Sequence, residues 1–279
     1  MEQPASSFSN NMASKPDART ISRLDTQTRL SWEKEKHQFS WWGVQDGMAV
    51  LEVGCGPGFF SRQLLAWLPT SPLTCVDINQ AFLEYARDLL SREAHRVRFV
   101  QASILAAHLP EQTFDVVFAR FVFQHLSDPL AAAQAIWRLL KPGGKLIIID
   151  SDDALFGMIH PAVPELPTLL ELYGQAQTMR GGNRQMGRQL WRLLAQAGFL
   201  PRAFEAIAFH SDELGMEVFR EHLDPERFVP LVKAKLLSEA TFVQARASFE
   251  RFLASRERFV MMLWLVAYGE KPSVNSEQR

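Results

Sequence analysis

The sequence predicts an α/β fold, a doubly wound and mostly parallel sheet of seven strands with helical cap insertions. From residue 49 onward, short apolar runs alternate with amphipathic segments at helical spacing. Runs such as VVF at 116–118 and LIIID at 146–150 are apolar without alternation, which is typical of strands buried on both faces. A glycine-rich stretch, GCGPG at 54–58, stands between the first strand and the first helix of this series. Alternating strands and helices with such a turn favour a parallel sheet.

Each predicted element follows from its own pattern. Apolar and β-branched runs predict strands at 49–55, 73–78, 97–103, 114–120, 145–151, 203–210 and 257–270. Apolar residues at helical spacing predict helices at 21–42, 59–68, 80–92, 131–140 and 188–198. Gly198 stands where a helix C-cap is expected.

The chain is organised as one domain with additions. Residues 1–20 are rich in Ser, Asn, Pro and Ala, which predicts a disordered tail. The helix at 21–42 is expected to act as a lid over a domain at 43–270. Cap elements are expected at 151–198 and 211–255, and a short tail at 271–279.

Composition excludes several classes of function. Thirty Lys and Arg against 31 Asp and Glu give a net charge of −1, without a basic run that would attract nucleic acid or an anionic membrane. The two cysteines are too few for a disulfide framework or a cysteine metal site, so no metal is expected. The sequence shows no signal-peptide pattern and no stretch of about 18 apolar residues, so we expect a cytoplasmic protein.

The glycine stretch marks the expected ligand site. Sheets of this kind bind ligands at the carboxyl ends of their strands, and glycines there let the backbone approach a ligand closely. The dinucleotide fingerprint G-x-G-x-x-G would require glycine at 59, where this chain has Phe59. This spacing weakens a nicotinamide-dinucleotide oxidoreductase hypothesis but leaves it open.

Several motifs, taken together, resemble one family. They are E-x-G-x-G-x-G at 52–58, Asp77 at the end of the second strand, FDVVFAR at 114–120 and LKPGGKLIIID at 140–150. In this order and spacing, over about residues 45–150, they resemble the class I S-adenosylmethionine-dependent methyltransferases. The likeness is to the bacterial small-molecule group that includes ubiquinone/menaquinone-methyltransferase-like enzymes. It implies S-adenosylmethionine as cofactor and S-adenosylhomocysteine as product.

The resemblance also implies roles for particular residues. Asp77 is expected to accept hydrogen bonds from both ribose hydroxyls, because a carboxylate suits a vicinal diol. Ser103 stands in the loop after the third strand, where the family usually has an aspartate for the adenine amino group. The implied cofactor-binding residues are Glu52, Gly54, Cys55, Gly56, Gly58, Asp77, Ile78, Ser103, Ile104, Ala119 and Arg120.

The expected methyl acceptor is a small, largely apolar or aromatic molecule. Residues 119–122 read ARFV, whereas enzymes that methylate nucleobase amino groups often carry an Asn/Asp-Pro-Pro-aromatic motif there. The expected cap is rich in Phe, Leu and Met, which suits an apolar ligand, although such stripes are more often ordinary core. No nucleic-acid or membrane partner is expected, and the chain is expected to be a monomer or a homodimer.

No residue is assigned as a general base. Methyl transfer from a sulfonium needs a base only when the acceptor atom carries a proton at neutral pH. The candidates near the strand ends are Arg120, His125, Asp152 and His160, with Asp153, Tyr173 and His210 as further possibilities. Two other functions stay open: an S-adenosylmethionine-binding protein that has lost catalysis or runs another reaction, and a nucleotide-dependent oxidoreductase of similar fold.

Overall fold

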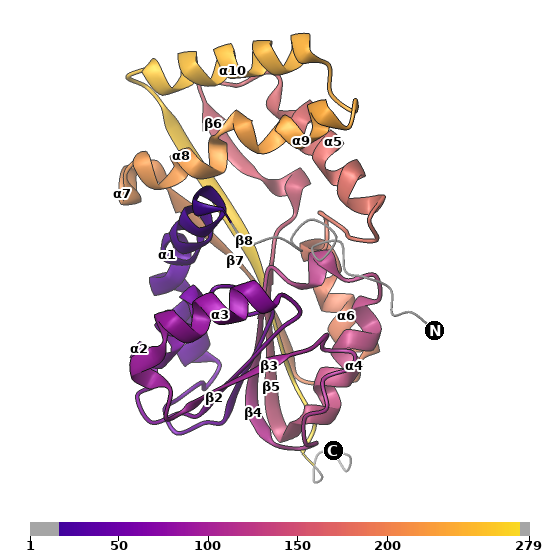
Figure 1. The fold of residues 1–279 in the computed structure, drawn as a ribbon. Coiled ribbons are helices and arrows are strands. Elements are labelled where there is room, and N and C mark those ends of the chain that lie inside the picture. Colours follow the sequence, from indigo (N-terminus) through magenta and orange to yellow (C-terminus); the bar gives the residue numbers. More distant parts are fainter. Residues whose placement is uncertain (1–16, 274–279) are drawn as a thin grey trace.

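The computed structural model describes residues 17–273, and their fold is the α/β architecture expected from the sequence (Figure 1). One sheet of eight strands runs in the order β3-β2-β1-β4-β5-β8-β6, with β7 also paired to β8. The expectation of seven strands was wrong by one, because Gly157–His160 pairs with β8 and forms β6. The strand has only four residues, and they show no alternation of apolar and polar side chains, so the sequence did not predict it.

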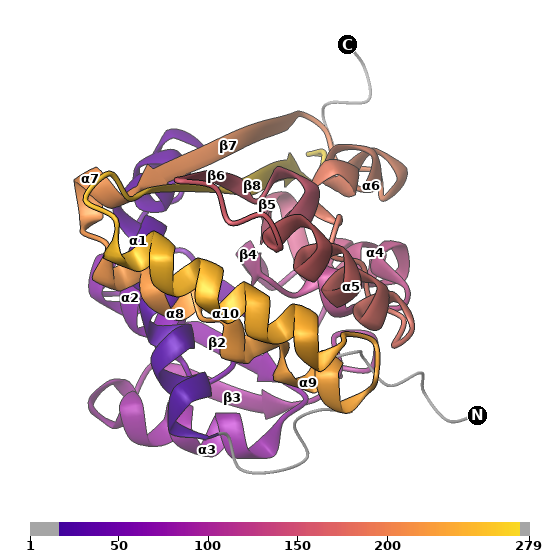
Figure 2. The same cartoon turned by 90° about the horizontal axis from the view of Figure 1, so that it is seen from above.

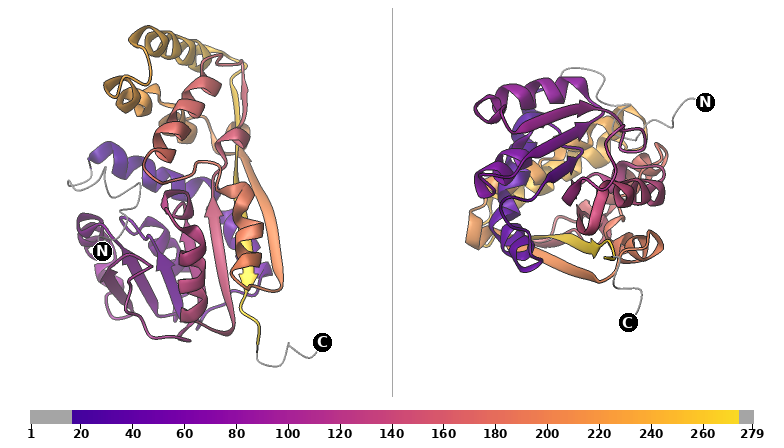
Figure 3. Two further views of the ribbon diagram at one scale, coloured as in Figure 1. Left: turned by 90° about the vertical axis from the view of Figure 1, so that its right-hand side faces the viewer. Right: turned by 90° about the horizontal axis from the view of Figure 1, so that it is seen from below.

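Five parallel strands form the lower part of the sheet. They are β1 (Val50–Val53), β2 (Leu73–Asp77), β3 (Val97–Gln101), β4 (Phe114–Arg120) and β5 (Leu140–Asp150). Helices cover both faces: α2 (Phe59–Trp67) and α3 (Gln80–Leu89) lie on one, and α4 (Pro129–Leu139) and α6 (Leu190–Gln196) on the other (Figure 3).

Successive side chains of β4 enter two different cores. Val116 and Phe118 belong to the core beneath α2, while Val117 and Ala119 belong to the core beneath α4. Because strand side chains alternate between faces, a strand covered on both sides must be apolar at every position. This geometry accounts for the unbroken apolar runs of the sequence.

The long antiparallel strand β8 (Phe259–Glu270) connects the parallel sheet to the upper part of the molecule. Its second half pairs with β5, from Asp150 opposite Leu265 to Lys145 opposite Glu270. Its first half pairs with β6 (Gly157–His160), and β7 (Arg202–His210) pairs along most of its other edge. The three strands therefore extend the sheet above the carboxyl ends of the parallel strands (Figure 1).

A roof of helices covers this upper sheet, as seen from above in Figure 2. It consists of α5 (Leu166–Thr178), α7 (Ser211–Leu214), α8 (Glu217–Leu223), α9 (Val229–Lys233) and α10 (Glu239–Ala254). Short 3₁₀ segments join the elements at Ser91–Glu93, Phe123–His125, Asp153–Leu155, Gly187–Gln189 and Pro225–Phe228. These helices come from the stretches that the sequence assigned to caps.

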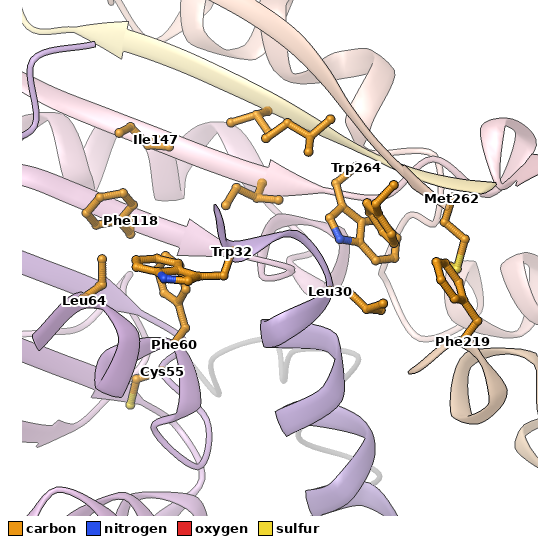
Figure 4. Close-up of a cluster of buried hydrophobic side chains, with 14 of the residues drawn as sticks. Leu30, Trp32, Cys55, Phe60, Leu64, Phe118, Ile147, Phe219, Met262 and Trp264 are labelled. Atoms are coloured by element: carbon orange, nitrogen blue, oxygen red, sulfur yellow. The ribbon is translucent and has the colours of Figure 1, made fainter. Parts of the chain in front are cut away.

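Helix α1 (Ala18–Trp41) has two different halves. Asp17 caps its N-terminus by accepting a hydrogen bond from the Thr20 amide at 2.7 Å, so the helix begins three residues before the predicted residue 21. In its second half, the Trp32 ring lies 5.8 Å from that of Phe60 (Figure 4). The Phe39 ring lies 5.0 Å from that of Phe118. This half is part of the core, and only the first half faces the cavity described below.

Local chemistry moved several predicted boundaries. Helix α4 begins at Pro129, two residues early, because Asp128 accepts from the Ala131 amide at 2.9 Å and proline suits the first helical turn. Helix α3 ends at Leu89 instead of residue 92, and β5 begins at Leu140 instead of 145.

The predicted tails are shorter where the structure describes them. Residues 18–20 are helical, and Lys271 is buried, with its ammonium donating to the Leu140 carbonyl at 2.8 Å. The remainder of both predicted tails, 1–16 and 274–279, lies outside the described residues. Over residues 17–273, no helix is long and apolar enough to cross a membrane.

Candidate active site

A cavity of about 620 Å³ lies between the carboxyl ends of the parallel strands and the roof. Its walls come from the loops after β1, β2, β3, β4 and β5, from the first half of α1, and from the roof. We call the part formed by residues 52–57, 76–78 and 102–104 the glycine-loop end. The part formed by Tyr173, Arg184, His222, Arg227 and Trp264 is the roof end.

The first two glycines of the loop differ in what lies beside their backbone at the glycine-loop end. Gly54 and Gly56 have positive φ angles of +68° and +53°, which glycine adopts without strain. A Cβ on Gly54 would lie 2.5 Å from the Val122 side chain, whereas a Cβ on Gly56 would meet no protein atom within 4 Å. Gly56 therefore faces open cavity, where a side chain would occupy ligand space.

Gly58, unlike Gly56, does not face the cavity and instead allows two helices to pack closely. It does not line the cavity, and its φ of +85° places it at the N-cap of α2. A Cβ there would lie 3.0 Å from the Ala86 Cβ and 3.3 Å from the Ala86 Cα on α3. The expectation that Gly58 contacts a cofactor is therefore corrected: this glycine lets two helices approach.

Asp77 closes the loop from the neighbouring strand. Its Oδ2 accepts from the Gly56 amide and its Oδ1 from the Asn79 amide, both at 2.8 Å. Each carboxylate oxygen has a second lone pair, so both can accept another hydrogen bond from a ligand in the cavity. Burial raises the pKa of Asp77, an effect that these backbone donors partly offset.

Glu52 is held below the loop. Its carboxyl group is buried and accepts a 2.5 Å hydrogen bond from the Ser61 hydroxyl. Burial, together with the nearby Asp77 charge, raises the pKa of Glu52 to about 8, although Ser61 and Arg120 act in the opposite direction. Glu52 is therefore mainly protonated at neutral pH and can donate as well as accept.

Most of the remaining predicted cofactor residues line the same end. Cys55, Ile78, Ser103 and Ile104 all border the cavity, and the Ser103 Oγ accepts from the Leu105 amide at 3.3 Å. Ala119 does not border the cavity, because its side chain points into the core beneath α4.

Arg120 fastens the first helix over the strand ends. Its guanidinium donates to both carboxylate oxygens of Glu35, at 3.0 and 3.1 Å, and to the carbonyl oxygen of Gln27 at 2.9 Å. Both members of this ion pair are buried. Arg120 borders the cavity as predicted, but its donors are largely used to hold α1.

The residue after Arg120 adopts an unusual backbone. Phe121 has a positive φ of +56°, which costs a non-glycine residue about 1–3 kcal/mol and is typical of functional sites. Its ring lies 4.9 Å from that of Trp264, and both rings border the cavity. The tertiary structure thus directs this side chain along the cavity wall.

The three other pocket candidates have different surroundings. His125 borders the cavity, and its Nδ1 lies 3.1 Å from the side-chain amide nitrogen of Gln177. Burial, together with the positive charges of Arg184 and Arg23, lowers the pKa of His125 to about 3. Asp152 also borders the cavity, but Arg188 holds its two oxygens at 2.5 and 2.8 Å. The prediction that His160 lies at the site is wrong: His160 ends β6, is 65% exposed and lies outside the cavity.

Of the further possibilities, Tyr173 and Asp153 border the cavity and His210 does not. The Asp153 carboxylate is held by Arg184 at 2.7 and 2.8 Å, and His210 lies 3.8 Å from Glu213 on the surface side. Four residues of the roof end were not predicted from the sequence: Arg184, His222, Arg227 and Trp264. They come from the segment after α5, from α8, from the 3₁₀ turn Pro225–Phe228 and from β8, so no single sequence motif contains them.

The described residues contain no group of three His, Cys, Asp or Glu side chains that could hold a metal ion.

Comparison with known proteins agrees with this geometry. Residues 51–148 match the family model described as "Methyltransferase domain". The chain is 31% identical over 153 residues to the malonyl-[acyl-carrier protein] O-methyltransferase of Paenibacillus sp., covering 54% of each protein. It is 34% identical over 122 residues to a ubiquinone/menaquinone biosynthesis C-methyltransferase of Haemophilus ducreyi, covering 42% of this chain and 46% of that one. The chain thus spans about half the length of the curated relatives it matches.

Solved structures share the fold over more of the chain. A phosphoethanolamine N-methyltransferase 2 of Haemonchus contortus, in complex with S-adenosyl-L-methionine, superposes on 96% of this chain and 55% of its own, with a TM-score of 0.54 and 20% identity. The [4+2]-cyclase SpnF superposes on 92% of this chain and 98% of its own, with a TM-score of 0.54 and 19% identity. At these identities the likeness shows the fold.

The open backbone at Gly56 and the carboxylate of Asp77 suit S-adenosylmethionine, the cofactor of this family. The matched segment, residues 51–148, contains both the glycine loop and the strand ends that surround it. Residues 51–148 therefore form a methyltransferase domain that is similar to those of the class I S-adenosylmethionine-dependent enzymes.

Proposed function

We propose that this protein transfers a methyl group from S-adenosylmethionine to a small molecule held beneath the roof. The observation that carries the proposal is the open space beside Gly56, bordered by the Asp77 carboxylate and enclosed above by α1 and the roof. The curated relatives act, by their names, on a quinone precursor or on malonyl-acyl-carrier protein, so the acceptor of this chain is a separate question.

The glycine-loop end would hold the cofactor through both backbone and side chains. Asp77 has a free lone pair on each carboxylate oxygen for a ribose hydroxyl. Ile78 and Ile104 supply apolar surface for the adenine ring, and the Ser103 hydroxyl lies beside them for its amino group. Gly54 and Gly56 would lie under the aminocarboxypropyl chain, and a side chain on Gly56 would exclude it.

The cofactor supplies a methyl group on a positively charged sulfur, and the chain supplies position and the exclusion of water. Apolar side chains border the rest of the cavity, among them Phe121, Phe156, Val229 and Met262. They would bury the apolar part of an acceptor, at about 25 cal/mol per Å² before the costs of association.

General-base catalysis finds little support among the cavity histidines. The pKa of His125 is lowered to about 3, and the pKa of His222 is also well below its usual range because both rings are buried near arginines. A base this weak removes a proton slowly from a hydroxyl or amine. Neither histidine is therefore suited to act as the base, and an acceptor atom that is already ionised or that carries no proton would need none.

Calorimetric titration with S-adenosylhomocysteine tests the cofactor site directly. We expect saturable binding, and we expect no binding of a nicotinamide dinucleotide in the parallel titration. The absence of S-adenosylhomocysteine binding by folded protein would contradict the proposal. Incubation of labelled cofactor with a bacterial metabolite extract then tests transfer, which appears as label in a small organic product.

Binding of the cofactor product without any methyl transfer would indicate a different function. The fold is also that of a [4+2]-cyclase, so the fold alone does not require methyl transfer. Tight binding of S-adenosylhomocysteine with no labelled product from any extract would favour a protein that keeps the cofactor for another reaction or for structure.

A further inference from the structure

Resting on the proposed function, we propose that the roof end of the cavity binds an anionic oxygen group of the methyl acceptor, a carboxylate or a phosphate, with Arg227 as its main ligand. The acceptor would then combine an apolar body with one negatively charged end. This is a narrower class than the apolar or aromatic small molecule expected from the sequence.

Two guanidiniums converge on one tyrosine at this end. Arg184 and Arg227 each lie 5.3 Å from the centre of the Tyr173 ring, and all three residues border the cavity. Arg184 comes from the segment after α5, and Arg227 from the 3₁₀ turn Pro225–Phe228 before α9. The tertiary structure therefore brings together positive charges that are 43 residues apart in sequence.

The acidic residues around this end already have partners. Asp153 is paired with Arg184 and Asp152 with Arg188. Glu226 lies 3.5 Å from Arg246, and Asp224 lies 4.0 Å from Arg19. None of these carboxylates is paired with Arg227.

Among the side chains that the structure describes, which do not include that of Glu221, none is an anionic partner of Arg227. Its guanidinium donates to the His222 carbonyl oxygen at 2.8 Å and packs over the rings of Tyr173 and Phe228. A guanidinium has five N–H donors in a planar fork that matches the oxygens of a carboxylate or phosphate. Arg227 therefore retains donors and charge for a ligand in the cavity.

Unpartnered polar atoms beside Arg227 are a second, independent observation. His222 and Trp264 are each only 5% exposed and border the cavity, and their rings lie 6.2 Å apart. Both ring nitrogens of His222 and the indole nitrogen of Trp264 are buried without a hydrogen-bond partner. Because buried polar atoms are nearly always satisfied, the indole N–H of Trp264 and the single N–H of the neutral His222 ring are two donors for which a ligand oxygen would supply the missing acceptor.

The local potential agrees with this assignment. Burial acts to raise the pKa of Tyr173, but the charges of Arg227, Arg184 and Arg23 outweigh it and lower the pKa. A site that stabilises a phenolate relative to a phenol also stabilises other oxyanions.

Three ligands with the same alkyl chain test the proposal: octanoate, octyl phosphate and octanol, titrated into protein saturated with S-adenosylhomocysteine. We expect octanoate or octyl phosphate to bind at least about 10-fold more tightly than octanol, since hydrogen bonds to charged groups contribute about that much. The tighter of the two anionic probes identifies the group as carboxylate or phosphate. Equal binding of all three, or tighter binding of octanol, would overturn the proposal.

Substitutions locate the effect. Arg227→Met should remove the advantage of the anionic probe over octanol, whereas Arg227→Lys should keep part of it because it retains the charge. The matched control is Arg220→Met on α8, since Arg220 is 63% exposed and pairs only with Glu217 among the described residues. Loss of the advantage in Arg220→Met as well, or its full retention in Arg227→Met, would contradict the assignment of Arg227.

Binding of S-adenosylhomocysteine separates this inference from the proposed function. If Arg227→Met still binds S-adenosylhomocysteine as the original protein does, the variant is folded and its probe result can be used. If the anionic probes show no advantage while S-adenosylhomocysteine binds normally, the inference fails and the proposed function stands. If the original protein does not bind S-adenosylhomocysteine, the proposed function itself fails.

Discussion

The glycine-loop end and the roof end of the cavity are built in different ways. At the glycine-loop end, the backbone of residues 54–56 and the neighbouring Asp77 come from two adjacent parallel strands. At the roof end, Tyr173, Arg184 and Arg227 are side chains from separate segments, joined only by the tertiary fold. A site made of backbone requires glycine at fixed spacing, whereas a site made of side chains leaves no local pattern.

The comparison also separates two kinds of glycine in one loop. Gly56→Val should abolish measurable binding of S-adenosylhomocysteine, because the new side chain would fill the open space beside the backbone. Gly58→Val should mainly lower stability, because its Cβ would lie 3.0 Å from that of Ala86. Titration and thermal unfolding of both variants measure the two effects. If Gly58→Val were as stable as Gly56→Val, the assignment of Gly58 to helix packing would be contradicted.

The attachment of α1 over the cavity depends on a buried ion pair. Glu35→Ala should lower the free energy of unfolding by about 3–5 kcal/mol, because it leaves the buried Arg120 charge without its carboxylate. Urea denaturation measures the loss. Glu33→Ala on the same helix is the control, since Glu33 is 76% exposed and should have almost no effect. A double variant, Glu35→Leu with Arg120→Met, should recover much of the stability, because it leaves no buried charge without a partner. Equal losses of stability in Glu35→Ala and Glu33→Ala would contradict the role of the ion pair.

Side-chain recognition at the glycine-loop end has a smaller expected effect. Asp77→Ala should weaken S-adenosylhomocysteine binding by about 1.5–3 kcal/mol, the usual contribution of hydrogen bonds to a charged group. Calorimetric titration measures it. Asp88→Ala on the exposed face of α3 is the matched control and should bind normally. An unchanged affinity in Asp77→Ala would show that the carboxylate only closes the loop.

The buried carboxyl of Glu52 makes stability depend on pH. Its pKa is about 8 in the folded protein against 4.5 for the ordinary group, so between these values the unfolded chain releases a proton that the folded chain retains. Stability should therefore fall as pH rises through this window. Glu52→Gln should remove this fall, by at most about 1.4 kcal/mol per pH unit. Glu84→Gln, at an exposed site, should leave the pH profile unchanged. A profile unaffected by Glu52→Gln would contradict the raised pKa.

The smallest effect concerns the two halves of α1. Added S-adenosylhomocysteine should increase hydrogen-exchange protection in residues 18–28 and in the loop at 54–60. Residues 32–41 should be well protected already, because Trp32 and Phe39 belong to the core. Exchange measured by mass spectrometry, with residues 145–150 of β5 as the protected reference, tests this. Equal protection of both halves in the free protein would show that α1 does not open as a lid.

Most of the strands and helices could be predicted from the pattern of apolar residues in the sequence. The two-sided burial of β4 and β5 requires apolar residues at successive positions, and such runs can be recognised without a structure. The errors in the predicted elements occur where helix capping or strand pairing sets a boundary. Asp128 caps α4 and starts it earlier than predicted, and β6 forms only because β8 is long enough to pair with it. His160 shows the consequence, because a residue expected near the site ends the unpredicted strand β6 with an exposed side chain.

By itself, the sequence determined the sheet, the glycine loop and the identity of the strand-end carboxylate Asp77. These depend on local conformation and on the short distance between neighbouring strands, both of which restrict residue type at fixed positions. Only the tertiary structure decided that Gly58 packs helices, that Arg120 holds α1 through Glu35, and that Arg227 faces the cavity beside His222 and Trp264. An arginine is compatible with many local conformations and environments. Its partner is therefore set by which distant segments the fold places against it.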